Sequence, residues 1–154
     1  GLQKAIRPDL HLGFGLSYQK SMLNSNYSNI DGERFEGGLI LKHRAGATRV
    51  SASLSAGYGH FNAQRLVDIV SPGIHAASKQ DVWSASLQGR VSHDIMNSES
   101  AYVRPMLGLA VSYVTRNGYS ESGAGGANLN VAKEDDTFVA LQPAVEFGAM
   151  RRAA

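Results

Sequence analysis

The feature that most constrains this chain is an alternation of apolar and polar side chains with a period of two residues. In residues 9–22 one parity is small or polar, and the other is apolar, with Leu10, Leu12, Phe14, Leu16 and Tyr18. Successive side chains of a β-strand point to opposite faces, so the pattern predicts a strand with one apolar face. The alternation recurs in residues 34–44, 48–60, 81–92 and 101–114, and a sixth segment, about 127–150, is expected to form one long strand.

The links between these six segments alternate in length. Residues 24–33, 62–80 and about 115–126 form long links, whereas residues 45–47 and 93–100 form short ones. Barrels of bacterial outer membranes have this asymmetry, with short turns at one rim and longer loops at the other. The expected fold class is therefore all-β, an antiparallel up-and-down meander that is part of a transmembrane outer-membrane β-barrel.

Aromatic and charged residues are distributed as a membrane-spanning sheet requires. At the long-link ends of the strands, the apolar parity carries five rings, which we predict to form a lipid-interface aromatic girdle: Tyr18, Phe35, Tyr58, Trp83 and Tyr113. Phe147 would mark the opposite interface. Six charged residues of the strands fall on the polar parity, as expected because a charge facing lipid at mid-membrane costs about 2–4 kcal/mol, whereas Lys20, His43 and His93 break the phase at strand ends, where that cost falls towards zero. The six are Glu36, Lys42, Arg49, Arg90, Arg104 and Glu146.

Composition excludes several other classes of protein. The net charge is +2, and no block of lysines or arginines suggests a nucleic-acid partner. The chain has no cysteine, which excludes a disulfide framework, a zinc–thiolate site and a cysteine nucleophile. No run of about 18 apolar residues predicts a transmembrane helix.

No motif for catalysis or for a cofactor is present, so we expect neither an enzyme nor a cofactor site. The chain contains no Gly-x-Ser-x-Gly elbow, no His-Glu-x-x-His and no Walker-type loop. No metal site is expected either. The acidic run Glu134-Asp135-Asp136 is interpreted as a solvated cluster, and the histidines lack ligand spacing: His11, His43, His60, His75 and His93.

A soluble antiparallel sandwich is the main structural alternative, since it also alternates apolar and polar residues. Its apolar faces would pack together and would carry bulkier Val, Ile and Phe. In this chain the polar parity is the unusual one, because it is rich in Gly, Ser and Ala. Small residues on that face favour a lumen that something else must occupy.

Several segments, taken in order, resemble the C-terminal β-domain of autotransporters, the translocator of type V secretion. The likeness covers nearly the whole chain and is carried by residues 9–18, residues 56–62 with Arg65, residues 81–85 with 88–90, residues 103–109 and residues 118–123. The last two resemble a strand entered through a proline and closed by a Gly-aromatic-x-Glu loop. The resemblance implies a barrel of about twelve strands, threaded by a linker helix that joins it to a secreted passenger.

The sequence predicts six strands, whereas the resemblance implies about twelve. Residues 1–154 are therefore expected to be a partial autotransporter β-barrel domain. The family ends in an aromatic residue, whereas this chain ends in Ala154, so we expect a fragment whose parent supplies about six further strands. The resemblance places the protein in the outer membrane of a Gram-negative bacterium. It implies a lumen lined by Glu36, Arg49, Arg90, Arg104 and Glu146.

The function implied by the resemblance is to anchor a passenger domain and help export it across the outer membrane. The expected partners are outer-membrane lipid, the passenger polypeptide with its linker helix in the lumen, and the outer-membrane assembly machinery. Two alternatives remain open: a porin or adhesin barrel without a passenger, and a soluble β-domain that binds a ligand.

Overall fold

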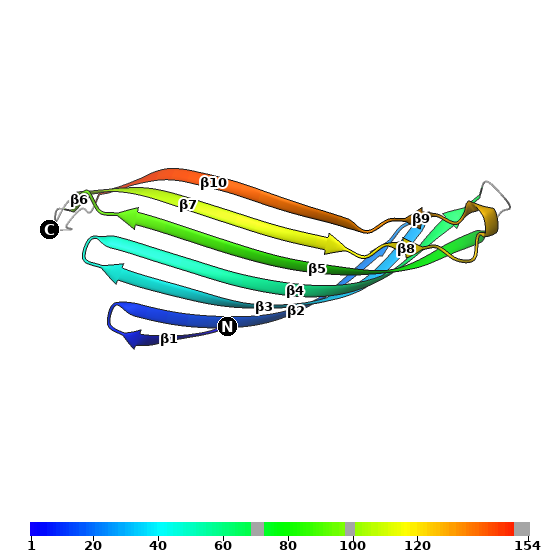
Figure 1. Cartoon of the computed structure of the whole chain (residues 1–154), viewed down its shortest axis with the longest axis horizontal. Coiled ribbons are helices and arrows are strands. Elements are labelled where there is room, and N and C mark those ends of the chain that lie inside the picture. Colours follow the sequence, from blue (N-terminus) through cyan, green and yellow to red (C-terminus); the bar gives the residue numbers. More distant parts are fainter. Residues whose placement is uncertain (69–72, 98–100, 150–154) are drawn as a thin grey trace.

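Most of the described part of the chain forms one curved antiparallel sheet, a single layer of long strands, and two short strands form a second sheet (Figure 1). The computed structural model describes residues 1–68, 73–97 and 101–149. The elements, in chain order, are β1 (Leu2–Arg7), β2 (Leu10–Asn24), β3 (Ser28–Ala45), β4 (Thr48–Val67), β5 (Ile74–His93), β6 (Met96–Asn97), β7 (Ala101–Arg116), β8 (Tyr119–Ser120), the 3₁₀ turn η1 (Gly125–Ala127), β9 (Asn130–Val131) and β10 (Glu134–Ala149). The order across the sheet is β1-β2-β3-β4-β5-β7-β10, which confirms the predicted up-and-down meander.

Tight turns lie at one end of the sheet, and the long β4–β5 hairpin extends from the other (Figure 1). Between β3 and β4 the chain reverses through Gly46 and Ala47, where Gly46 has a φ of 58°. This left-handed conformation favours glycine in a short hairpin turn. The turn between β2 and β3 lies at the same end as the β4–β5 turn. There the Ser25 hydroxyl oxygen accepts a hydrogen bond from the Ser28 backbone N–H at 2.9 Å.

The strands are longer than the sequence predicts, and the expected long links are wrong in extent. Residues 28–33 belong to β3, and residues 61–67 and 74–80 extend β4 and β5 well past the predicted ends. Backbone pairing continues there although the apolar alternation has stopped, since ladder hydrogen bonds do not require apolar side chains. Residues 69–72, within the predicted link 62–80, lie outside the described residues.

The predicted sixth strand is also wrong at its start. β10 begins at Glu134, and the residues before it form η1 and a separate two-stranded sheet in which Val131 of β9 faces Tyr119 of β8. Leu129 and Val131 share the parity of Val139, so the alternation alone gave no sign of the break at residues 132–133. Met150, at the predicted end of this strand, lies outside the described residues.

The sequence did not predict β1. This strand pairs with β2, with Leu2 opposite Phe14 and Lys4 opposite Leu12. Lys4 therefore lies on the apolar parity and hides the alternation that identified the other strands. The main sheet thus contains the six predicted strands, β1 at the β2 edge, and the two-residue strand β6, which pairs with β7.

The described residues contain no extended hydrophobic core. The buried hydrophobic residues among them are Val67, Ala76 and Ala124, which form one small cluster near the tip of the β4–β5 hairpin. The accessible surface is 10984 Å², whereas a compact monomer of this mass exposes about 7,500 Å². The sheet therefore leaves uncovered an area that a globular domain would bury.

Candidate functional site

One face of the sheet is apolar across all six long strands. The register places Phe14 opposite Leu39, Leu39 opposite Leu54, and Leu54 opposite Leu87. The row continues through Val111 to Val139 in β7 and β10. These side chains point away from the protein, since Leu16 is 81% exposed, Leu54 53% and Leu141 65%. An exposed apolar surface of this extent requires a nonaqueous contact.

The five predicted girdle residues lie on this apolar face at the same end of their strands. Tyr18 faces Phe35, Phe35 faces Tyr58, and Tyr58 faces Trp83. The ring centroids are 4.7 Å apart in the Tyr18–Phe35 pair and 4.6 Å apart in the Tyr58–Trp83 pair. Tyr113 lies opposite Ala85, which is the next residue after Trp83 on the same face of β5. The rings therefore form a nearly level row across five strands.

A polar row begins directly beyond the aromatic row on the same face. It consists of Lys20, Glu33, His60 and Asp81, each opposite the next in the register. His60 Nδ1 lies 2.7 Å from Asp81 Oδ1, and the Tyr58 hydroxyl donates a hydrogen bond to the same oxygen at 2.8 Å. The face thus changes from apolar to polar at the level of the rings.

The apolar band has the height that a membrane requires. In β4 it covers residues 50–58, from Val50 to Tyr58, and a strand tilted by about 40° with a rise of ~3.3 Å per residue makes this about 20 Å. With the flanking side chains, the band approaches the roughly 25 Å apolar belt of outer-membrane barrels. No helix among the described residues is long and apolar enough to cross a membrane.

The opposite face is lined by small side chains. One cross-strand row joins Gly15 to Gly38, Gly38 to Ser55, Ser55 to Ser86 and Ser86 to Ser112. The Ser86 and Ser112 hydroxyl oxygens are 2.9 Å apart. We call these five small residues the small belt. A Cβ added at Gly38 would lie only 3.1 Å from the Leu54 carbonyl oxygen, so the backbones of β3 and β4 leave little room for a larger residue there. Because these side chains are small, they leave free volume on the side of the sheet that they face.

The five residues predicted to line a lumen all lie on this polar face, and the structure brings three of them together. Arg104 of β7 is opposite Glu146 of β10, and its Nη1 lies 3.0 Å from Glu146 Oε2. Arg49 of β4 joins them through the Asp94 carboxylate, which Arg104 also contacts. Glu36 lies apart and pairs instead with Arg34 at 3.0 Å. Arg90 is in the middle of the face, away from both groups.

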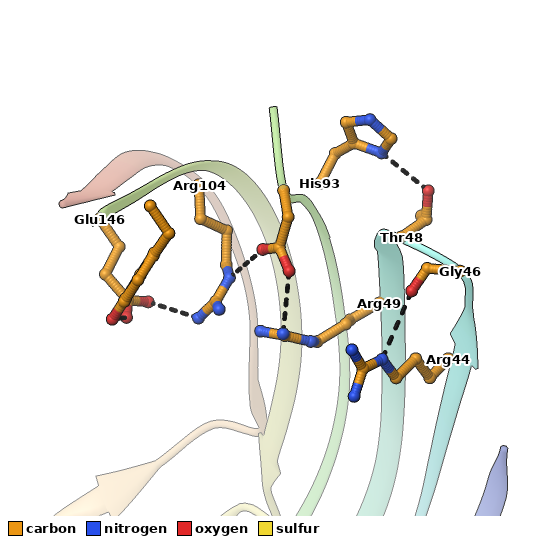
Figure 2. Close-up of polar contacts among 9 residues, drawn as sticks. Arg44, Gly46, Thr48, Arg49, His93, Arg104 and Glu146 are labelled. Atoms are coloured by element: carbon orange, nitrogen blue, oxygen red, sulfur yellow. Dashed lines mark hydrogen bonds and ion pairs between the residues drawn. The ribbon is translucent and has the colours of Figure 1, made fainter. Parts of the chain in front are cut away.

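Asp94 links the charged residues near the turn that follows β5, and the sequence analysis did not identify it. Figure 2 shows Arg49 and Arg104 reaching the same carboxylate from β4 and β7. The contacts are 2.9 Å from Arg49 Nη2 and 2.5 Å from Arg104 Nε, and the Asp94 side chain is 4% exposed. The hydrogen bond from Arg104 lowers the pKa of Asp94 below its usual range. The available signal was an acid that continues the polar parity of β5, two residues past the predicted end of the strand at residue 92.

Glu146 completes this cluster on the β10 side. It accepts hydrogen bonds from Arg104 and from the Tyr102 hydroxyl. The Arg104 guanidinium also lies 4.8 Å from the centroid of the Tyr102 ring. The Tyr102 ring fills the space beside Gly148, where a Cβ would lie 2.0 Å from a ring carbon. The cluster therefore ties β4, the turn after β5, β7 and β10 together at the short-turn rim.

At the opposite rim, Arg65 and Glu121 fasten the β7–β10 connection to the β4–β5 hairpin. Arg65 Nη2 lies 2.7 Å from Glu121 Oε2, the Leu129 backbone N–H donates to the same oxygen, and the Glu121 side chain is 6% exposed. Arg65 is the main cause that lowers the pKa of Glu121. The adjacent buried residues are Val67, Ala76 and Ala124. Arg65 and Glu121 both belong to the segments that resemble the autotransporter domain, but their spacing of 56 residues gave no sign of contact.

The residues available to bind metals do not gather into a site. Among residues 1–68, 73–97 and 101–149, no group of three or more His, Asp or Glu side chains could hold a metal ion. His43 lies 3.4 Å from Asp9, and His93 lies 2.9 Å from the Thr48 hydroxyl, so these two rings have local structural contacts.

A single sheet with one exposed apolar face and one face of small and ion-paired residues defines a wall of a membrane-spanning β-barrel. The family model described as autotransporter beta-domain matches residues 1–150, and the chain belongs to that family. It is thus a β-barrel chain of the bacterial outer membrane.

A solved structure supports the same fold. The chain resembles the translocator domain of the autotransporter NalP from Neisseria meningitidis, with a TM-score of 0.76 at 12% sequence identity. The match covers 94% of this chain and 50% of that one, so the chain spans about half the length of the solved domain. None of the curated proteins matches the sequence.

Proposed function

We propose that this chain supplies about half of the wall of an outer-membrane pore that anchors a passenger domain and helps export it. The observation that supports this most directly is the division of six long strands into one apolar and one polar face, kept in register across the sheet. The role is mechanical and electrostatic, not catalytic.

The apolar face would contact lipid in this proposal. Tyr18, Phe35, Tyr58, Trp83 and Tyr113 would lie at the outer interface, where amphipathic rings are favoured. The polar row of Lys20, Glu33, His60 and Asp81 would lie at the level of the headgroups. Membrane lipid is therefore the first proposed partner.

The polar face would line the lumen, with Glu36, Arg49, Arg90, Arg104 and Glu146 among its residues. The small belt of Gly15, Gly38, Ser55, Ser86 and Ser112 leaves room for a linker helix and for the passing passenger. Paired charges such as Arg104 with Glu146 avoid the cost of unsatisfied ions inside the pore.

Residues 1–154 would be part of one barrel domain whose other strands pair with β1 and β10. Both are edge strands here, and open sheet edges do not occur in hydrocarbon, because their backbone groups would lack hydrogen-bond partners. Strand addition of this kind is the step at which we propose that the outer-membrane assembly machinery acts.

Fluorescent labels on single introduced cysteines test the assignment of the two faces, because the chain has no cysteine of its own. We expect labels at Leu54 and Leu109 of the closed barrel to be quenched by brominated lipid. Labels at the matched neighbours Ser53 and Gly108 should instead be quenched by iodide in water. Iodide quenching at Leu54, or a monodisperse β-rich chain in buffer without detergent, would contradict the proposal.

Export is tested separately by surface display. A reporter passenger joined to the closed barrel through its linker should become accessible to external protease on intact cells. A barrel that inserts normally but never exposes its reporter would support a porin or adhesin without a passenger.

A further inference from the structure

The middle of the polar face holds a cross-strand row that contains two cations without acidic partners. The register joins His11 to Lys42, Lys42 to Ser51, Ser51 to Arg90, Arg90 to Gly108 and Gly108 to Gln142. Lys42 and Arg90 are therefore separated by the single strand β4, which presents only the small Ser51 between them. We call Lys42 and Arg90, with Ser51, the basic row.

The basic row lies in a hollow of about 280 Å³ on this face. Its polar lining includes Lys42, Ser51, Ser53, Gln88, Arg90 and Gln142. Gln142 lies over Gly108, where a Cβ would be 3.4 Å from the Gln142 Cβ. Hydroxyl and amide groups thus surround the two cations, and no acid lines the hollow.

Four other cations of the polar face have acidic partners, whereas Arg44, nearer the short-turn rim, donates a hydrogen bond to the Gly46 carbonyl oxygen at 3.4 Å. Arg34 pairs with Glu36, Arg49 and Arg104 share Asp94, and Arg116 pairs with Glu134 at 2.5 Å. Among the described residues, Lys42 and Arg90 form no ion pair. Acids therefore pair with four cations above and below the basic row, but with neither Lys42 nor Arg90 within it.

The remainder of a closed barrel does not reach this row. Strands spaced about 4.8 Å apart and tilted by about 40° give a twelve-stranded barrel a diameter of about 24 Å, too wide for side chains of opposite walls to meet. A strand added beyond β10 would be separated from β5, which carries Arg90, by the two strands β7 and β10. Only a group inside the lumen can reach Lys42 and Arg90 together.

We infer that Lys42 and Arg90 bind a carboxylate side chain, Asp or Glu, of the polypeptide that occupies the lumen. This inference rests on the proposed function, because it requires the polar face to line a filled pore. Arginine presents parallel N–H donors that match a carboxylate, and lysine adds a mobile second donor. The row would hold the occupant at mid-membrane and favour acidic segments over basic ones.

Peptide block of the closed barrel in a planar bilayer tests this inference. The barrel is prepared without its linker, and the probes are two alanine-rich helical peptides that differ only in Glu against Gln side chains. The Glu peptide should block ion current at about tenfold lower concentration than the Gln peptide, since a charged hydrogen bond contributes enough free energy for that factor. The double variant Lys42→Gln/Arg90→Gln should abolish the difference.

The controls separate the inference from the proposed function. Lys79→Gln, which removes one exposed cation from the β4–β5 hairpin, should leave the preference for the Glu peptide unchanged, and the exchange Lys42→Arg/Arg90→Lys should retain most of it. Equal block by both peptides in the unaltered barrel would overturn this inference alone. An unaltered barrel that inserts but conducts no current would overturn the proposed function.

Discussion

The two faces of the sheet use the same backbone and the same register, yet they follow opposite packing rules. On the apolar face, large side chains such as Leu54 and Leu87 lie side by side and more than half exposed. On the polar face, small residues such as Ser55 and Ser86 leave space, and some charged groups, such as Arg104 with Glu146, form ion pairs. Since a slip of one residue would exchange the faces, their contrast fixes the register of every strand pair.

The largest effect should come from placing a charge on the apolar face. Leu54→Arg in the closed barrel is expected to lower the free energy of unfolding by about 2–4 kcal/mol, the cost of an arginine facing lipid near mid-membrane. Urea unfolding in detergent-free vesicles measures it. Ser53→Arg, one residue away on the other face, should cost far less, and equal losses would abolish the distinction between the faces.

A smaller effect is expected from the charge cluster on the polar face. Asp94→Asn leaves Arg49 and Arg104 without their shared carboxylate, so the urea midpoint should fall. Glu36→Gln is the matched control, because Glu36 has one arginine partner and its side chain is 39% exposed. The midpoint should fall less for this control, and a larger fall would show that the cluster does not hold the sheet together.

The aromatic row should contribute less than either. Trp83→Ala removes the ring contact with Tyr58 and is expected to cost about 1 kcal/mol beyond the loss of buried area. Phe138→Ala removes an exposed ring from the polar face and serves as the control. If both variants lower the free energy of unfolding equally, the position of Trp83 at the edge of the apolar band does not add to stability.

The smallest effect is local and depends on pH. The pKa of Glu121 is lowered in the folded state, mainly by Arg65, so its contribution to stability is fully present above the unfolded pKa and is lost as pH falls through the folded pKa. Hydrogen exchange in residues 119–131 should therefore accelerate on acidification, after correction for intrinsic rates. Glu121→Gln should accelerate exchange at neutral pH and remove the pH dependence, whereas exchange in β4 near Leu54 should not change.

Features that depend on parity alone could be predicted from the sequence. Tyr18 and Phe35, far apart from Trp83 in the chain, were assigned to one row because each occupies the apolar parity near a strand end. The register of the structure places them on one face and at one level, while their contact with lipid stays a prediction. Alternation succeeds here because the side-chain period of a strand is two wherever the strand is.

Features that depend on contacts between distant residues could not be predicted. Asp94 lies off the strands, and its two arginines come from β4 and β7, so no local pattern connects them. Arg65 and Glu121 meet only because the β7–β10 connection folds back onto the β4–β5 hairpin. The starts of β3 and β5 were placed too late and the end of β4 too early for a different reason, since backbone pairing extends beyond the apolar alternation.

The short strand β1 has a consequence for how the sheet can close. Every neighbouring pair in the main sheet is antiparallel, so β1 and β10, at the two ends of a seven-membered order, run in the same direction. A second copy joined edge to edge around a common vertical axis would bring parallel strands together and break the alternation. In the proposed barrel, a complement that closes the cylinder antiparallel throughout would need an odd number of strands, which is five for a total of about twelve, the number that the resemblance implies.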